Sequence, residues 1–104
     1  ISGGENIYST QVESAIHKHE GVLECAVIGI PDDEWGEAVK AVVVMKPGES
    51  ATEADIISTA KEHLASYQKP KSIDFVESLP KAPTGKILKR ELRDPYWNRL
   101  ERKV

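Results

Sequence analysis

Two short apolar runs that are neighbours in the sequence constrain the fold more than any other feature. Val22–Ile30 and Ala38–Met45 are rich in β-branched residues, which favour strands. Turn-forming residues lie between them, with Pro-Asp-Asp at 31–33 and Trp-Gly-Glu at 35–37, and Pro-Gly follows at 47–48. The simplest arrangement is an antiparallel strand pair at the centre of a small sheet.

Two other segments show helical spacing, and each opens with a capping box, in which Thr and an acidic residue three positions later exchange backbone hydrogen bonds. The pairs are Thr10 with Glu13 and Thr52 with Asp55. The first predicts a helix over about 10–20, ended by Gly21. The second predicts a helix from 52 to near Ser66, whose outer face carries Lys61 and Glu62.

The last third of the chain begins with Ser72–Val76, which is short enough to be an edge strand. A loop over 77–86 follows, and helical spacing resumes at Ile87 until Asp94-Pro95 caps and restarts a short terminal helix. This order predicts an α+β fold, with helices packed on a small three-stranded sheet and residues 1–104 forming one domain.

Size and composition limit what such a chain does alone. Its 104 residues suit one modest core but leave little room for a two-substrate enzyme, so a partner is expected. A formal charge of −3 gives no overall attraction for nucleic acid, and no apolar run approaches the roughly 20 residues of a membrane span. With Cys25 as its single cysteine, the chain suits a reducing cytoplasm.

The most informative stretch is P-K-A-P-T-G-K-I-L-K-R-E-L at 80–92. It is not a phosphate-binding P-loop, because Pro80 replaces the required first glycine and Ile87 replaces the Ser or Thr after the lysine. For an isolated T-G-K tripeptide, a solvated turn would be the better interpretation.

The wider context favours a functional interpretation. Pro80 to Arg93 closely resembles the C-terminal signature of the adenylate-forming superfamily, which includes acyl-CoA synthetases, peptide-synthetase adenylation domains and beetle luciferases. The opening residues 1–13 resemble the glycine loop of that family, and 31–37 and 67–71 also look like its C-terminal domain. One departure is Ser9, where the family often has proline; Ser9 or Thr10 is expected to cap the helix instead.

This resemblance implies that Lys86 is catalytic in ATP-dependent adenylation of a carboxylic acid of the fatty-acid type, and that Pro80 and Gly85 support its loop. ATP would be bound with Mg²⁺, mainly by a larger N-terminal domain of the same parent chain. In bacterial acyl-CoA synthetases this lysine is also an acetylation target, so an acetyltransferase and a deacetylase are candidate partners.

The resemblance also implies a second half-reaction, in which the domain rotates and Ser2, Gly3 and Gly4 line the pantetheine channel for coenzyme A. Asn6 is a candidate nucleotide contact. Lys61 is a candidate partner for a CoA phosphate, although a solvated lysine is the commoner case. Because the phosphate-binding loop, the hinge and the acyl pocket lie upstream of Ile1 in the family, this chain is expected to be inactive alone.

Two alternatives stay open. The parent enzyme could load a carrier protein instead of CoA, or the chain could be a stand-alone nucleotide- or CoA-binding module. The identity of the acid is expected to be set by the acyl pocket, which in the family belongs to the larger N-terminal domain. A metal site is not expected, because His17, His19 and His63 lack ligand spacing.

Overall fold

The computed structural model describes residues 7–32, 36–65 and 69–102. Along the chain they form the elements α1 (Ile7–Ile16), β1 (Val22–Asp32), β2 (Gly36–Met45), α2 (Glu53–Lys61), β3 (Ser72–Phe75) and α3 (Lys89–Arg102). This is the expected order, and the predicted α+β class is confirmed. In these ranges no helix combines the length and the apolar character that crossing a membrane requires.

The three strands form one sheet in the order β1-β2-β3. β1 and β2 are antiparallel, as predicted, with Val27 opposite Ala41. β3 is the predicted edge strand, and it runs parallel to β2 with Ile73 beside Ala41. Parallel neighbours need a crossover connection, which α2 supplies between β2 and β3.

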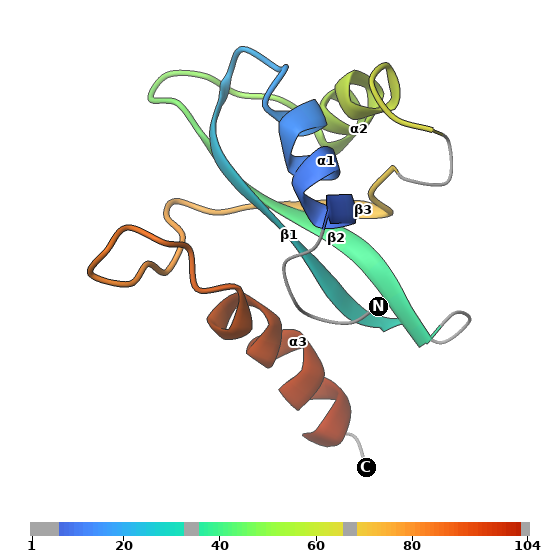
Figure 1. Cartoon of the computed structure of the whole chain (residues 1–104), viewed down its shortest axis with the longest axis vertical. Helices are drawn as coiled ribbons and strands as arrows, with labels where there is room; N and C mark the ends of the chain where they lie inside the picture. The colour runs from blue at the N-terminus through green and yellow to red at the C-terminus, as the bar shows by residue number, and fades with distance from the viewer. Residues whose placement is uncertain (1–6, 33–35, 66–68, 103–104) are drawn as a thin grey trace.

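The sheet is covered on both faces, which explains why its two central runs are almost continuously apolar (Figure 1). Successive side chains of a strand point to opposite faces. One set packs with α1 and α2, and the other packs with Leu79 and the start of α3. The first set comprises Cys25, Val27, Ala41 and Val43; the second comprises Ala26, Ile28, Val42 and Val44.

The capping box predicted for α2 is confirmed. The Thr52 hydroxyl accepts the Asp55 N–H at 3.1 Å, and the Asp55 carboxylate accepts the Thr52 N–H at 3.0 Å. These bonds to Thr52 hold the pKa of Asp55 below its ordinary value. The helix is shorter than predicted, since it ends at Lys61 and turns follow up to Leu64. Ser66 lies outside the described residues.

The start predicted for the first helix is wrong. α1 already begins at Ile7, so Ser9 and Thr10 lie inside it and neither is its N-cap. The Ser/Thr-x-x-Glu spacing also brings side chains together within a helix, so it does not by itself mark a start. α1 ends at Ile16 instead of Glu20. Tighter turns follow, in which the Lys18 N–H donates to the Ala15 carbonyl and the His19 N–H donates to the Ile16 carbonyl.

The break predicted at Asp94-Pro95 is also wrong, because α3 continues through Pro95 from Lys89 to Arg102. The residues just after the proline hold this part of the helix against the sheet. The Tyr96 hydroxyl donates to the Asp74 carboxylate, and the Trp97 indole donates to the Gly29 carbonyl at 3.0 Å. These tertiary contacts compensate for the backbone hydrogen bond that a proline cannot make.

On each edge strand of the sheet, a glutamate from a helix accepts one backbone N–H. On β1, the Val27 N–H donates to Glu13 of α1 at 2.8 Å. On β3, the Ile73 N–H donates to Glu53 of α2 at 2.8 Å. Outward-facing backbone donors on edge strands otherwise invite pairing with other chains, so each carboxylate satisfies one such donor and ties its helix to the sheet.

Candidate functional site

The segment that carries Lys86 is a small β-hairpin of residues 80–88, called here the lysine hairpin. Lys81 and Ile87 pair as an antiparallel bridge, and the Leu88 N–H donates to the Pro80 carbonyl at 2.9 Å. Nearer the tip, the Ala82 N–H donates to the Lys86 carbonyl at 2.8 Å. The expected loop is therefore an ordered hairpin, with Lys86 on its returning arm.

The sequence Pro83-Thr84-Gly85 accounts for the tip. The Gly85 N–H donates to the Ala82 carbonyl at 2.8 Å, so residues 82–85 form a β-turn with Pro83 in its second position, where proline is favoured. Gly85 then adopts a φ of +94°, a conformation that residues with a Cβ rarely adopt. Three-residue hairpin loops commonly end in such a glycine, which directs the next residue back along the hairpin.

Replacing Gly85 with alanine should therefore impair any function that needs Lys86 in place. A Cβ at this position meets no atom within 4 Å, so the cost comes from backbone conformation alone and is about 1–2 kcal/mol. If the hairpin relieves this strain by changing shape, the adenylation activity that the family resemblance implies for a complete parent enzyme should fall by about tenfold. The measurement is ATP–pyrophosphate exchange.

Gly48 provides the matched control, because its φ is +81° and its added Cβ also meets nothing within 4 Å. It lies in the turn after β2, so Gly48→Ala should cost similar stability without slowing exchange. Equal losses of exchange in both variants would show that general destabilisation, and not the hairpin, is responsible.

The lysine hairpin is attached to the rest of the fold at several points. Leu79, directly before it, is buried against the β1–β2 face, and Ile87 packs against the same cluster. An ion pair joins Lys81 on the outgoing arm to Glu24 on β1. A second ion pair joins Lys89, directly after the hairpin, to Glu13 at 2.7 Å. These contacts hold the base of the hairpin while its tip projects.

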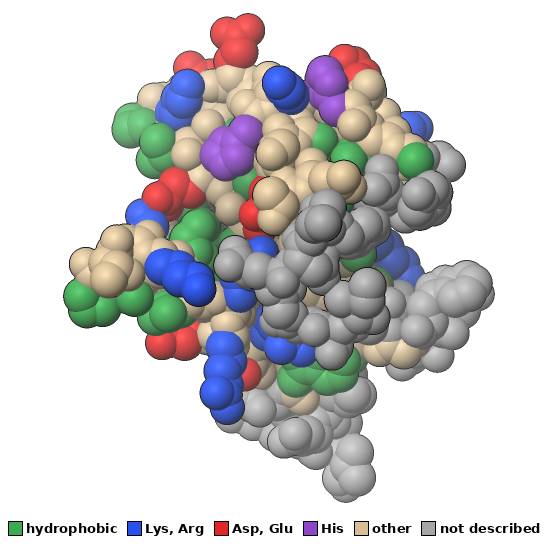
Figure 2. Space-filling model, viewed as in Figure 1, with side chains coloured by type: hydrophobic (Ala, Val, Ile, Leu, Met, Phe, Trp, Pro, Cys, Tyr) green, Lys and Arg blue, Asp and Glu red, His purple; other side chains and the backbone are tan. Residues whose placement is uncertain are grey.

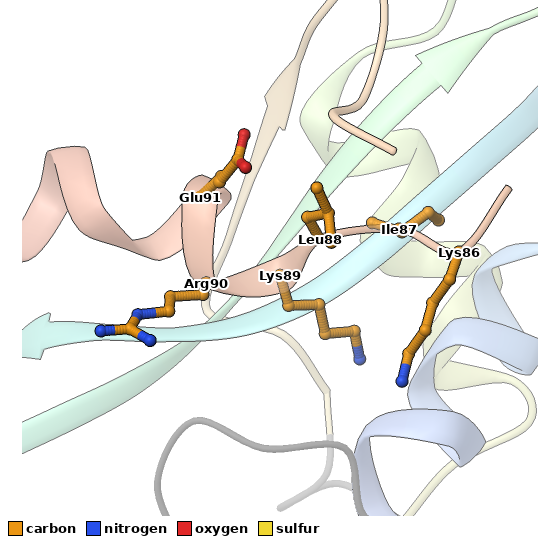
Figure 3. A pocket seen from close by; sticks show the side chains of 6 residues that line it. All are labelled: Lys86, Ile87, Leu88, Lys89, Arg90 and Glu91. Atoms are coloured by element: carbon orange, nitrogen blue, oxygen red, sulfur yellow. The ribbon is translucent and has the colours of Figure 1, made fainter. Parts of the chain in front are cut away.

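Residues 86–91 line a shallow pocket of about 400 Å³ where the hairpin passes into α3 (Figure 3). Figure 3 shows Lys86 and Lys89 extending to the same side, whereas Arg90 and Glu91 point away from them. The Lys86 side chain is exposed. In Figure 2, Lys and Arg side chains gather on the surface between the hairpin and α3. An exposed ammonium in cationic surroundings suits contact with an anionic substrate.

Cys25 lies close to the second ion pair, and its Sγ is 3.6 Å from the Glu13 carbonyl oxygen. Burial raises the pKa of this thiol to about 12; the Glu13 charge adds to the rise and the Lys89 charge opposes it. The thiol is therefore protonated at neutral pH and is a packing residue, not a nucleophile.

Residues 11–86 match the AMP-binding enzyme C-terminal domain family, a stretch that includes the whole sheet and reaches Lys86 itself. The chain belongs to this family.

Two curated relatives illustrate this AMP-binding C-terminal domain in different enzymes. The fatty acid–[acyl-carrier-protein] ligase ScoC of Streptomyces coeruleorubidus is 44% identical over 104 residues, which is 100% of this chain and 20% of the relative. The long-chain-fatty-acid–CoA ligase FadD13 of Mycobacterium tuberculosis is 48% identical over 96 residues, 92% of this chain and 19% of the relative. The chain thus spans about a fifth of the length of these relatives.

Solved structures give the same result. MatB from Rhodopseudomonas palustris superposes with a TM-score of 0.82 at 42% identity, covering 92% of this chain and 19% of that one. A Mycobacterium tuberculosis fatty acyl CoA synthetase superposes with a TM-score of 0.82 at 46% identity, covering 95% and 20%. The fold of the AMP-binding C-terminal domain is therefore shown by sequence and by structure.

The predicted site residues of this domain fall into three groups. Lys86, Gly85 and Pro80 come together in the lysine hairpin. Lys61 is exposed at the end of α2, which packs on the opposite face of the sheet from Leu79 and Ile87, so the fold does not bring Lys61 to the hairpin. The predicted glycine loop of Ser2, Gly3 and Gly4 lies outside the described residues, and so does the candidate nucleotide contact Asn6.

Sequence reasoning missed the residues that hold the hairpin. The capping spacing assigns Glu13 to a helix cap, and nothing in the sequence around Lys89 indicates Glu13 as its partner, yet the two side chains form an ion pair. Lys81 and Glu24 are 57 positions apart, and nothing in the local sequence of either signals the partner. Within the described residues, no three His, Cys, Asp or Glu side chains gather as a metal site would require.

Proposed function

We propose that this chain is the mobile C-terminal domain of an AMP-forming acid–thiol ligase, and that a larger N-terminal domain of the same parent chain completes the enzyme. Its role would be to deliver the Lys86 ammonium to the ATP site during adenylation of a carboxylic acid, for which we propose a fatty acid. The observation that carries the proposal is the exposed Lys86 at the end of a hydrogen-bonded, anchored hairpin.

In the adenylation step, an oxygen of the substrate carboxylate attacks the α-phosphorus of ATP, the bond to the bridging oxygen breaks, and pyrophosphate leaves. Catalysis of such transfers depends mainly on positioning and on stabilising charge at the phosphate oxygens. The Lys86 ammonium is cationic at neutral pH, and its long stem lets it reach both the carboxylate and the phosphate. Mg²⁺ would be held mainly by the other domain.

In the second step, a thiol sulfur attacks the acyl carbon, AMP leaves, and the thiol proton is lost. We assign the glycine loop at Ser2, Gly3 and Gly4 to the pantetheine channel of this step, because glycine lets the backbone approach a thin ligand closely. Asn6 and Lys61 are further candidate contacts to nucleotide or CoA phosphates. The separation of Lys61 from the lysine hairpin across the sheet is compatible with different faces of the domain serving the two steps.

The second candidate function is adenylation followed by transfer to a carrier protein. One observation favours it: the relative that is 44% identical over the whole chain is named as an acyl-carrier-protein ligase. Against it, FadD13 is named as a CoA ligase and is 48% identical over 92% of the chain. We favour CoA, and a stand-alone CoA- or nucleotide-binding module is the third alternative.

The deciding experiment uses the complete parent enzyme, the parent without residues 1–104, and the 104-residue chain alone. We expect acid-dependent ATP–pyrophosphate exchange from the complete enzyme only. With CoA as acceptor an acyl-CoA should form, whereas a phosphopantetheinylated carrier protein should give little product. Product on the carrier protein alone would establish the second candidate, and exchange that survives removal of this domain would refute the proposal.

A further inference from the structure

The ion pair between Glu13 and Lys89 joins α1 to the first residue of α3, three positions after Lys86. Lys89 Nζ lies 2.7 Å from Glu13 Oε2, and only 11% of the Lys89 side chain and 20% of the Glu13 side chain are exposed. Water therefore screens this pair far less than it screens a surface salt bridge. Lys81–Glu24 on the other arm is more open, with exposures of 40% and 27%.

Glu13 is itself held rigidly. Its neighbours Val12 and Ile16 are fully buried in the core between α1 and the sheet, which fixes the helix that carries it. The same carboxylate oxygen that meets Lys89 accepts the Val27 N–H of β1 at 2.8 Å. The carboxylate is thus a fixed anionic point on the edge of the sheet, bound by α1 and β1 together.

Lys89 connects this fixed point to the hairpin. It is the first residue of α3, and only Ile87 and Leu88 separate it from Lys86 in the sequence. The Leu88 N–H donates to the Pro80 carbonyl at 2.9 Å, so the two arms of the hairpin are joined directly beside Lys89. A shift of Lys89 relative to Glu13 would therefore move the base of the hairpin, and Lys86 with it.

We propose that Glu13 and Lys89 are positioning residues for the adenylation step, which set where the Lys86 ammonium lies when the hairpin enters the ATP site. This inference rests on the proposed function of Lys86. Neither residue touches the substrate; each acts through the backbone of the hairpin. A displacement of about 1 Å at a reacting group can cost about 10²-fold in rate, so a loosened hairpin base has a measurable effect.

The experiment uses the complete parent enzyme with Glu13→Gln, Lys89→Met, the double variant, and Lys89→Arg. Each charge-removing single variant should lower the kcat of ATP–pyrophosphate exchange by about tenfold, while thioester formation from supplied acyl-adenylate stays within about twofold. Lys89→Arg keeps the charge, so its kcat of exchange should stay close to that of the unsubstituted enzyme. The double variant should be no slower than the slower single variant, because both remove the same interaction.

Exposed residues provide matched controls: Glu62→Gln and Lys18→Met make the same chemical changes away from the pair and should leave both steps unchanged. Equal losses in the two half-reactions would reveal a purely structural role and overturn the inference, as would additive losses in the double variant. Lys86→Ala is measured alongside. If it abolishes exchange while the Glu13 and Lys89 variants do not, only this inference fails; if it leaves exchange intact, the proposed function itself fails.

Discussion

Replacing Lys86 with alanine in the complete parent enzyme is expected to slow acyl-adenylate formation by roughly 10²–10³, the loss typical of removing one preorganised charge-stabilising donor. The reason is local. The exposed ammonium at the end of the lysine hairpin is the cation that this domain would bring to the carboxylate and the α-phosphate. The bonds that join the two arms of the hairpin, from Ala82 to Lys86 and from Leu88 to Pro80, are made by backbone atoms, so the substitution keeps them.

The two half-reactions must be measured separately. ATP–pyrophosphate exchange reports adenylation, and thioester formation from supplied acyl-adenylate reports the second step, which should change much less. Lys46→Ala is a suitable control, since Lys46 is an exposed lysine in the turn region after β2. Normal exchange combined with a loss of thioester formation would contradict the role assigned to Lys86.

Acetylation offers an independent way to neutralise the same amine. We propose that Lys86 is open to modification by a lysine acetyltransferase and a deacetylase, because its side chain is exposed at a projecting hairpin. A homogeneously acetylated enzyme should lose adenylation as Lys86→Ala does, since the charge is removed. Unchanged exchange in the acetylated enzyme would dispose of this regulatory role.

The central part of the fold could be predicted because its signals are local. The two β-branched runs and the turn residues between them predict the β1–β2 pair, and Thr52 with Asp55 predicts the start of α2. Local signals of the same kind gave wrong helix boundaries where tertiary contacts determine the start or the continuation of a helix. Thr10 and Glu13 have capping spacing but lie within α1, and Pro95 does not break α3 because Tyr96 and Trp97 hold the helix against the sheet.

The candidate site was predictable to the same extent. The resemblance indicated Lys86, Gly85 and Pro80, and all three lie in one hairpin, but the stretch 77–86 was expected to be a loop and residues 80–88 are an ordered hairpin with Gly85 at positive φ. The orientation of β3, parallel to β2, and the ion pairs that hold the hairpin depend on residues distant in the sequence. Whether a carboxylate caps a helix or pairs with a remote lysine is decided by packing, which local spacing does not encode.

The largest expected effect on stability comes from Asp74, which joins β3 to α3. Its carboxylate lies 2.8 Å from Lys40 Nζ and accepts the Tyr96 hydroxyl, and Lys40 Nζ lies 5.4 Å from the centre of the Tyr96 ring. The Lys40 side chain is only 10% exposed, whereas Asp74 is 40% exposed. Asp74→Ala therefore leaves a nearly buried ammonium without its carboxylate and should lower the free energy of unfolding by about 2–3 kcal/mol. This loss is smaller than that from breaking a fully buried ion pair, because water reaches Asp74.

The reverse change should be milder. Lys40→Met places an apolar side chain of similar length beside Val42 and Val44 and leaves a carboxylate that water can solvate. We therefore expect Asp74→Ala to lower the free energy of unfolding more than Lys40→Met does, and Lys40→Met combined with Asp74→Ala to recover part of the loss. Urea unfolding of the 104-residue chain measures all three, with Leu23→Ala, an exposed truncation on β1, as the control.

This asymmetry separates two explanations of how α3 is held. If the ion pair were itself the main source of stability, removing either partner would cost the same. If apolar packing of Tyr96 and Leu92 against the sheet dominates, the cost follows the burial of the charge that is left behind. Equal losses in the two single variants, or a double variant less stable than Asp74→Ala, would contradict the second explanation, which the unequal exposure of the two side chains favours.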